Sequence, residues 1–265
     1  MFSCKKQLKS VIRASALVGL FTIHGAPGLL AEPSAPTYLP NNYGKSITTP
    51  VAWCASGNVV FAGVGGTRPS SYSPASDGAC LIGIGVGDPR EYVALQGAIV
   101  SLDLTGWQDY SLSLQLSREL GHADAISIGA ESIMLTGEGD ADQSFYIVYS
   151  KGVQGEPFVN RSNGQSRLHY SIGAGTNRFA RKSPFDIANG KGRNGTALFT
   201  NIAYDVFGAF NAIVDWNGVN LNAGASKSFT LIGFPVVATF GAADLTNNSG
   251  DRVRAVFGIG TGFKL

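Results

Sequence analysis

Hydrophobic and polar residues alternate along most of the chain after residue 50. Between residues 110 and 117, alternate positions hold tyrosine or leucine, and the positions between them hold serine or glutamine. Residues 167–175, 210–216 and 219–226 alternate in the same way. Because successive side chains of a β-strand point to opposite faces, this period of two predicts strands with one apolar and one polar face. No segment has the 3.6-residue spacing of a convincing amphipathic helix.

The end of the chain, residues 253–265, shows the same pattern in its clearest form. One face is apolar and is formed by Val253, Ala255, Phe257, Ile259, Phe263 and Leu265. The other face carries glycine or a positive charge, at Arg254, Gly258, Gly260, Gly262 and Lys264. The chain therefore ends in a strand whose two faces suit two different solvents.

Twelve strands are predicted along the chain. They span residues 51–63, 79–87, 92–104, 110–120, 124–135, 144–153, 167–175, 197–207, 210–216, 219–226, 236–245 and 253–265. Most have about the ten residues that a tilted strand needs to cross a bilayer. Polar turns separate them, and Asn217-Gly218 is a strong hairpin signal.

The N-terminus is typical of an exported protein. Four basic residues, Lys5, Lys6, Lys9 and Arg13, precede a short apolar run, and a cleavage site follows at Ala31. Residues 1–31 are therefore predicted to be a signal peptide. Residues 32–49, with three prolines, are predicted to be a flexible N-terminal segment, and residues 50–265 form the folded domain.

Composition narrows the functional classes. The chain has 265 residues, of which 44% are hydrophobic and only 14% are charged, against about 25% charged in a typical soluble domain. The formal net charge of +2 becomes −2 once the four basic residues of the signal are removed. The positive charge thus belongs to the targeting segment, and nucleic-acid binding is not expected.

Two cysteines, Cys54 and Cys80, remain after removal of the signal. In an exported protein such a pair favours a disulfide over a metal site. Two unpaired thiols are the alternative.

The signal segment, the alternating strands, the Gly-x-Gly strand interiors and the closing Phe263-Lys264-Leu265 resemble bacterial outer-membrane β-barrel proteins as a class. The resemblance covers residues 50–265, and it departs from the class at Leu265, where an aromatic residue is usual. It implies an all-β fold, a closed antiparallel transmembrane β-barrel of about twelve strands (10–14). It also implies an assembly signal at Phe263 and Leu265, and it places the protein in the outer membrane of a Gram-negative-type bacterium. The implied partners are outer-membrane lipid, lipopolysaccharide and the barrel-assembly machinery.

In such a barrel the polar strand faces point inward. Several charged or titratable residues on these faces are predicted to line the lumen: Glu131, Arg167, His169, Asp215 and Arg254. The longest connection, residues 176–195, is predicted to lie outside the cell. Its basic residues, Arg178, Arg181, Lys182, Lys191 and Arg193, suit lipopolysaccharide or anionic solutes, although an ordinary solvated loop would have the same composition.

Two further clusters contain residue types that chemical sites use. His169 and Ser171 share one strand face, which could place a base beside a nucleophile, and loosely resemble the His-x-Ser-Asn-Gly signature of outer-membrane phospholipases. The Asn of that signature is missing, and a structural histidine on the inner wall is favoured. Glu138, Asp140 and Asp142 could bind a hard cation weakly, but a solvated acidic loop is favoured.

The sequence therefore predicts a non-enzymatic barrel without a cofactor, acting as a narrow, porin-like pore or as a structural envelope protein. Three alternatives stay open. The first is a surface-binding barrel that acts through loop 176–195, and the second is a membrane-embedded hydrolase that uses His169 and Ser171. The third is a secreted soluble β-sandwich in which the apolar faces pack against each other.

Overall fold

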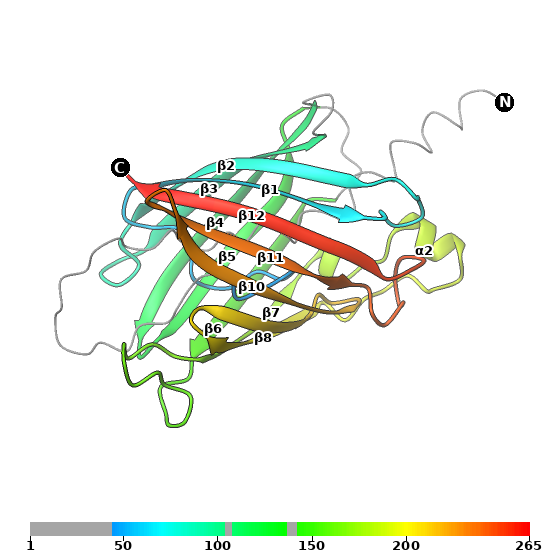
Figure 1. Ribbon diagram of the computed structural model, residues 1–265. Helices are drawn as coiled ribbons and strands as arrows, with labels where there is room; N and C mark the ends of the chain where they lie inside the picture. Colours follow the sequence, from blue (N-terminus) through cyan, green and yellow to red (C-terminus); the bar gives the residue numbers. More distant parts are fainter. Residues whose placement is uncertain (1–43, 104–107, 137–141) are drawn as a thin grey trace.

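Twelve antiparallel strands form one closed barrel in the computed structural model, which describes residues 44–103, 108–136 and 142–265 (Figure 1). Each strand pairs with its neighbours in sequence, and β1 pairs with β12 to close the barrel. The strands are β1 (Val59–Arg68), β2 (Asp77–Gly87), β3 (Ala94–Asp103), β4 (Gln108–Gly121), β5 (Asp124–Met134), β6 (Ser144–Gly152), β7 (Leu168–Gly175), β8 (Leu198–Phe207), β9 (Phe210–Trp216), β10 (Leu221–Leu231), β11 (Phe234–Ala243) and β12 (Arg254–Lys264). The predicted fold class and the predicted strand number are confirmed.

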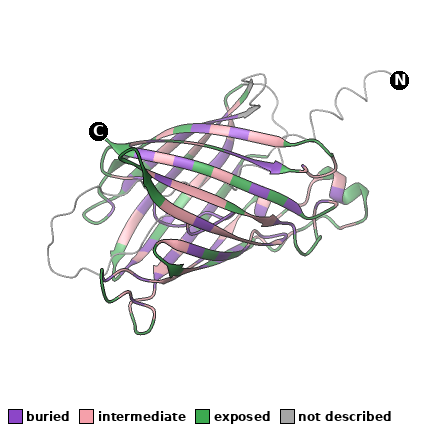
Figure 2. Ribbon diagram, in the orientation of Figure 1, coloured by how far each residue is buried: buried purple, intermediate pink, exposed green. Residues whose placement is uncertain are grey.

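The wall of the barrel separates two kinds of side chain. On β6, Phe145 and Ile147 are exposed on the outside, whereas Ser144, Val148 and Ser150 are buried on the inside. Other strands alternate in the same way, as the bands of buried and exposed residues in Figure 2 show. The exterior is thus largely apolar, and polar residues such as serine, asparagine and glutamine gather on the inner face. This is the inside-out pattern of a barrel that faces hydrocarbon.

The first strand differs most from its prediction. It begins at Val59 rather than at residue 51, because residues 51–55 are buried on all sides and do not belong to the wall. Residues 44–49, assigned above to the flexible N-terminal segment, are largely buried as well. The predicted signal and residues 32–43 lie outside the described residues.

Residues 44–57, here called the inner segment, run through the interior of the barrel before β1 begins. Their side chains and backbone contact inward residues of β3, β4, β6, β8, β9 and β10. In Figure 1 this part of the chain is the blue trace enclosed by the strands. The lumen is therefore filled by the protein's own chain.

Apolar side chains fill the remaining interior in layers. Trp53 of the inner segment packs in one cluster with Tyr146, Phe179 and Phe199, and the rings of Phe179 and Phe199 stack 4.5 Å apart. Gly173 lies under the Phe199 ring, where a Cβ atom would collide with it. Small inward residues thus make room for large ones on the next strand.

The two ends of the barrel differ in structure. At one end, loop 176–195 folds into a 3₁₀ turn η1 (Asn177–Phe179) and a short helix α2 (Pro184–Ala188). We call this the α2 end, and the opposite end, where β12 finishes, the C-terminal end (Figure 1). In the part of the chain described, no helix is long and apolar enough to cross a membrane.

Candidate functional site

The inner segment is held at its turn by one carboxylate. Asp215 on β9 is buried and accepts hydrogen bonds from the backbone N–H groups of Ile47 and Thr48, at 3.0 and 2.8 Å. The Thr48 hydroxyl donates to its second oxygen at 2.9 Å. Inside this turn, the backbone N–H of Thr49 donates to the Ser46 hydroxyl at 2.9 Å. A carboxylate that accepts several N–H and O–H donors is among the strongest polar anchors a protein can form.

Polar residues of the wall bind the backbone on the β1 side of this turn. The side-chain amide of Gln115 donates to the carbonyl of Val51 at 2.7 Å. The backbone N–H of Ala52 donates to the Ser150 hydroxyl at 2.8 Å, and its carbonyl accepts from the Ser117 hydroxyl. The wall therefore supplies the hydrogen-bond partners that this irregular backbone would otherwise lack.

On the other side of the turn the chain runs back along β9 and β10. Lys45 is buried, and its ammonium group donates to the Asn211 side chain at 2.5 Å. The Ser226 hydroxyl donates to the carbonyl of Gly44 at 2.6 Å. The inner segment thus enters the lumen as a hairpin, with Ser46 to Thr49 at its tip.

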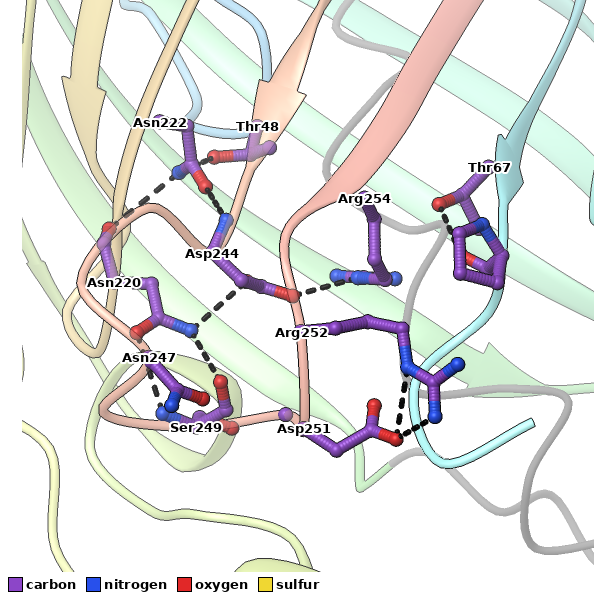
Figure 3. Close-up of polar contacts among 12 residues, drawn as sticks. Thr48, Thr67, Asn220, Asn222, Asp244, Asn247, Ser249, Asp251, Arg252 and Arg254 are labelled. Atoms are coloured by element: carbon purple, nitrogen blue, oxygen red, sulfur yellow. Dashed lines mark hydrogen bonds and ion pairs between the residues drawn. The ribbon is translucent and has the colours of Figure 1, made fainter. Parts of the chain in front are cut away.

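A polar network joins this tip to the α2 end of the wall (Figure 3). The Asn222 side chain donates to the hydroxyl of Thr48 at 3.0 Å and to Asp215 at 2.7 Å. The Asn222 carbonyl oxygen accepts from the backbone N–H of Asp244 at 2.9 Å. The Asp244 carboxylate pairs in turn with Arg254 at 2.6 Å. The tip is thus linked through Asn222 and Asp244 to Arg254 at the start of the last strand.

Loop 176–195 contributes one residue to the interior. Arg178 forms an ion pair with Glu131 on β5 and donates to the carbonyl of Thr48 at 3.1 Å. Its guanidinium also lies 4.0 Å from the Phe179 ring centroid. The prediction of Arg178 as an external residue is therefore wrong, because an unpaired buried carboxylate on the wall requires a cation and this loop supplies it.

Four of the five residues predicted to line the lumen do face the interior: Glu131, His169, Asp215 and Arg254. They bind other parts of the chain or pack against them. Arg167 does not line the lumen. Its guanidinium lies over the ring of Tyr204, 4.9 Å from the centroid, and donates to the carbonyls of Asp205 and Val206 at the C-terminal end.

His169 and Ser171 are both buried on the inner face of β7. The Ser171 hydroxyl is hydrogen-bonded to Ser150 at 2.7 Å. Neither ring nitrogen of His169 has a hydrogen-bond partner among the described residues, and the ring packs edge-on against Trp53 at 5.7 Å. The hydroxyl is thus engaged with another serine, and both side chains point away from the lipid-facing surface.

The predicted disulfide is absent. Cys54 and Cys80 are both free thiols. Cys54 belongs to the inner segment and is buried, whereas Cys80 alternates with the inward residues Ala79 and Leu81 and so faces outward. The barrel wall separates the two sulfur atoms, which prevents a bond between them.

The remaining basic residues of loop 176–195 divide into two groups. Lys182 donates to the carbonyl of Lys191 at 2.6 Å, and Lys191 donates to Asn247 at 2.6 and 2.9 Å. Arg181 and Arg193 are exposed. The loop is therefore tied to the neighbouring β11–β12 loop, and only some of its basic side chains are exposed to solvent.

Asp186 ties three loops together at the α2 end. Its carboxylate accepts hydrogen bonds from the hydroxyls of Tyr72, Ser183 and Ser249 and from the backbone N–H of Gly250. Burial opposes ionisation of Asp186, but these donors outweigh it and hold the pKa of the carboxyl below its ordinary 3.8. Burial and the neighbouring Asp186 raise the pKa of Tyr72.

The remaining predictions concern the weak cation-binding residues and the assembly signal. Glu138 and Asp140 lie outside it, and Asp142 is exposed. No group of three potential metal ligands occurs among the residues the structure describes. Phe263 and Leu265, the predicted assembly signal, are exposed on the outer face of β12 and just beyond its end.

Sequence reasoning missed the inner segment, although a signal was present. A strand between lipid and a wet lumen should alternate, but residues 51–55, Val-Ala-Trp-Cys-Ala, are apolar at every position. That composition indicates burial on all sides rather than in a wall.

No protein-family model matches the chain, and no curated protein does either. Among solved structures, the chain is similar to outer membrane phospholipase A from Escherichia coli, with a TM-score of 0.40 and 9% identity over 80% of this chain and 94% of that chain. It is also similar to the Salmonella typhi outer membrane phospholipase dimer with bound calcium, with a TM-score of 0.38 and 9% identity over 78% of this chain and 91% of that chain. Neither similarity assigns an activity or a site residue to this chain.

Proposed function

We propose that the protein is a non-enzymatic structural barrel of the bacterial outer membrane, held closed by its own inner segment. The observation that carries this proposal is the filled lumen. Asp215, Gln115 and Arg178 bind the segment from three different elements, β9, β4 and loop 176–195. Such a barrel adds a rigid, sealed body to the envelope rather than an open path for solutes.

The membrane location is supported by the outer surface. Exposed apolar side chains occur on every side of the barrel, among them Ile82, Leu114, Ile147, Ile202 and Phe257. Large exposed apolar surfaces are unfavourable in water and favourable in hydrocarbon. The predicted signal peptide, the alternating strands and the apolar C-terminal strand agree with export to the outer membrane.

A closed state is favoured over a narrow pore because the residues expected to provide a wet lining are used internally. Glu131 pairs with Arg178, and Asp244 pairs with Arg254. A conducting lumen needs polar groups that solvate passing ions. Here those groups bind the inner segment and one another.

The non-enzymatic role is supported by the surroundings of His169 and Ser171. A nucleophilic serine needs a base within hydrogen-bond reach, and the Ser171 hydroxyl is bonded to Ser150 instead. Outer-membrane lipid and lipopolysaccharide are the proposed surroundings, and the barrel-assembly machinery is the proposed partner during insertion. The exposed Arg181 and Arg193 would meet lipopolysaccharide phosphates.

Planar-bilayer recording tests the closed state. The mature wild type is expected to give no steady conductance steps, whereas a variant lacking residues 44–56 is expected to conduct. Heat-modifiable migration on a detergent gel verifies that both proteins are folded barrels. Equal conductance of the two proteins would contradict the proposal.

A separate assay tests the non-enzymatic role. Ester and phospholipid cleavage by the wild type and by Ser171→Ala in the same vesicles are expected to be equal and at background. Cleavage by the wild type that Ser171→Ala abolishes would instead establish a hydrolase.

A further inference from the structure

The C-terminal end of the barrel is chemically uneven. The β2–β3 turn carries Asp88, Arg90 and Glu91, and the β6–β7 connection carries Glu156 and Arg161. In contrast, the β8–β9 and β10–β11 turns carry no charge. No charged residue occurs in residues 228–243, which run from the second half of β10 to the end of β11. The charges of the turns are therefore concentrated on the β2–β7 side of this end, although that side also exposes Tyr92 and Val93.

The uncharged side presents large apolar side chains. Phe207 is 64% exposed, Ile232 is 89% exposed and Leu265 is 71% exposed. They belong to an apolar arc that we define as Val206, Phe207, Leu231, Ile232, Phe234 and Leu265. The arc follows the adjacent strands β8 to β12.

Contacts tie the parts of this arc together. The ring of Phe234 meets the ring of Phe263 at 6.4 Å, which joins the β10–β11 turn to the last strand. Lys227 on β10 lies 5.8 Å from the centre of the Phe207 ring and donates to the carbonyl of Gly208. The β10–β11 turn lies beside the C-terminus in Figure 1. The arc is thus one continuous surface.

The conformation of Ile232 points to a use outside the barrel. Leu231 pairs with Phe234, so Ile232 and Gly233 form a two-residue turn, with φ of 50° and 83°. Such turns favour asparagine and glycine, and a β-branched residue at positive φ is strained. Because the side chain is almost fully exposed, packing within the chain does not offset this strain. An exposed outlier of this kind is a reason to look for an external contact.

The arc continues into the apolar exterior of the barrel. Phe240 and Phe257, which are paired across β11 and β12, are exposed on the outer face above it. Lys227 lies at its border, beside the Phe207 ring, and can meet lipid phosphates. An apolar surface with a basic residue at its border matches the boundary between acyl chains and headgroups.

We propose that the apolar arc is embedded in the acyl region of the leaflet at the C-terminal end, while the charged turns on the opposite side remain in water. The barrel is consequently tilted, with the β8–β12 side deeper in the membrane than the β2–β7 side. This inference rests on the membrane location proposed above. The ligand it names is bulk lipid, and a second copy of the chain is the competing occupant.

Site-directed spin labelling in vesicles of phosphatidylethanolamine and phosphatidylglycerol tests the tilt. In a full-length mature background with Cys54→Ala and Cys80→Ala, single cysteines replace Ile232 and Phe207 in the arc. Asn163→Cys marks the charged β6–β7 connection, and Ile147→Cys marks the outer surface of the barrel. Collision rates with oxygen, which partitions into lipid, are compared with those of a water-soluble nickel chelate. Heat-modifiable migration confirms that each labelled protein is folded.

Labels at Ile232 and Phe207 are expected to collide several-fold more with oxygen than with the chelate, as at Ile147, and the label at Asn163 is expected to show the reverse. Arc labels that behave like Asn163 would overturn the tilt while leaving the membrane location intact. Arc labels shielded from both reagents would indicate contact between copies and overturn the lipid assignment. A water-exposed label at Ile147 would overturn the membrane location, and the tilt with it.

Discussion

The Asp215 carboxylate accepts hydrogen bonds from both the backbone N–H and the hydroxyl of Thr48, at 2.8 and 2.9 Å. The two residues are separated by most of the chain, and one belongs to the wall while the other is the tip of the inner segment. Both are buried. The relationship fixes the depth of the segment in the lumen, because the tip cannot move without breaking bonds to a buried charge.

Replacing Asp215 is expected to release the inner segment. Asp215→Ala leaves the N–H groups of Ile47 and Thr48 without their acceptor, which should cost about 2–4 kcal/mol of unfolding free energy, since hydrogen bonds to charged groups contribute roughly 1.5–3 kcal/mol each. Asp215→Asn keeps one acceptor oxygen and should cost less. Urea unfolding in vesicles, followed by tryptophan fluorescence, measures both. Glu156→Gln in an exposed loop is the control, and equal effects at the two sites would contradict the anchor.

Cys54 and Cys80 are expected to remain reduced and to differ in reactivity. After denaturation without reductant, both thiols should react with maleimide, and mass spectrometry should count two labels. In the folded barrel Cys54 should stay unlabelled, since it is buried. The Cys80→Ala variant assigns the labels. A single denatured chain with no reactive thiol would instead reveal a disulfide.

The Glu131–Arg178 pair is expected to behave asymmetrically. The Arg178 side chain is 22% exposed and that of Glu131 is 6% exposed. Arg178→Met therefore leaves the more deeply buried charge unpaired and should cost about 3 kcal/mol, in the range for a broken buried pair. Glu131→Gln should cost less, because Arg178 keeps the carbonyl of Thr48. In a double-mutant cycle of unfolding free energies, the double variant should lose less stability than the sum of the two single variants. Strictly additive losses would argue against coupling between the two residues.

The loops at the α2 end are expected to loosen in acid through Asp186. Its pKa in the folded protein lies below its ordinary value of 3.8, so its ionised form is favoured by folding. The stabilisation is complete above about pH 3.8 and is lost as the pH falls through the lowered folded pKa. Thermal unfolding should show this loss in the wild type between neutral and strongly acidic pH. Asp186→Asn should be less stable than the wild type at pH 7 and should lose less stability on acidification. A variant with the same pH dependence as the wild type would contradict the role of Asp186.

Much of the wall could be predicted from the sequence. A strand between hydrocarbon and a polar interior must alternate, and β7, β9 and β12 do so clearly enough that both their limits and their inward faces were predictable. Inward Glu131, His169, Asp215 and Arg254 follow from the same period. Local chemistry is sufficient here because the alternation depends only on which side of the wall a residue faces, hydrocarbon or the polar interior, and not on the identity of its partner.

The contents of the lumen could not be predicted in this way. Whether Arg178 points to solvent or to Glu131 depends on how loop 176–195 folds, and no local pattern encodes that. The separation of Cys54 from Cys80 likewise depends on which of them lies inside the wall. The interior contacts join residues far apart in sequence, so their partners are fixed only by the complete barrel.

The inner segment continues directly into β1, and β1 is the strand that β12 must meet to complete the sheet. The polar residues that bind the segment are spread over six strands, so they surround it only once most of the sheet has curled. The first and last strands therefore join around an occupant that is already covalently attached beside the joint. The occupant of the lumen and the seam that closes the sheet are therefore neighbours along the chain as well as in space, so a change that displaces one acts directly on the other.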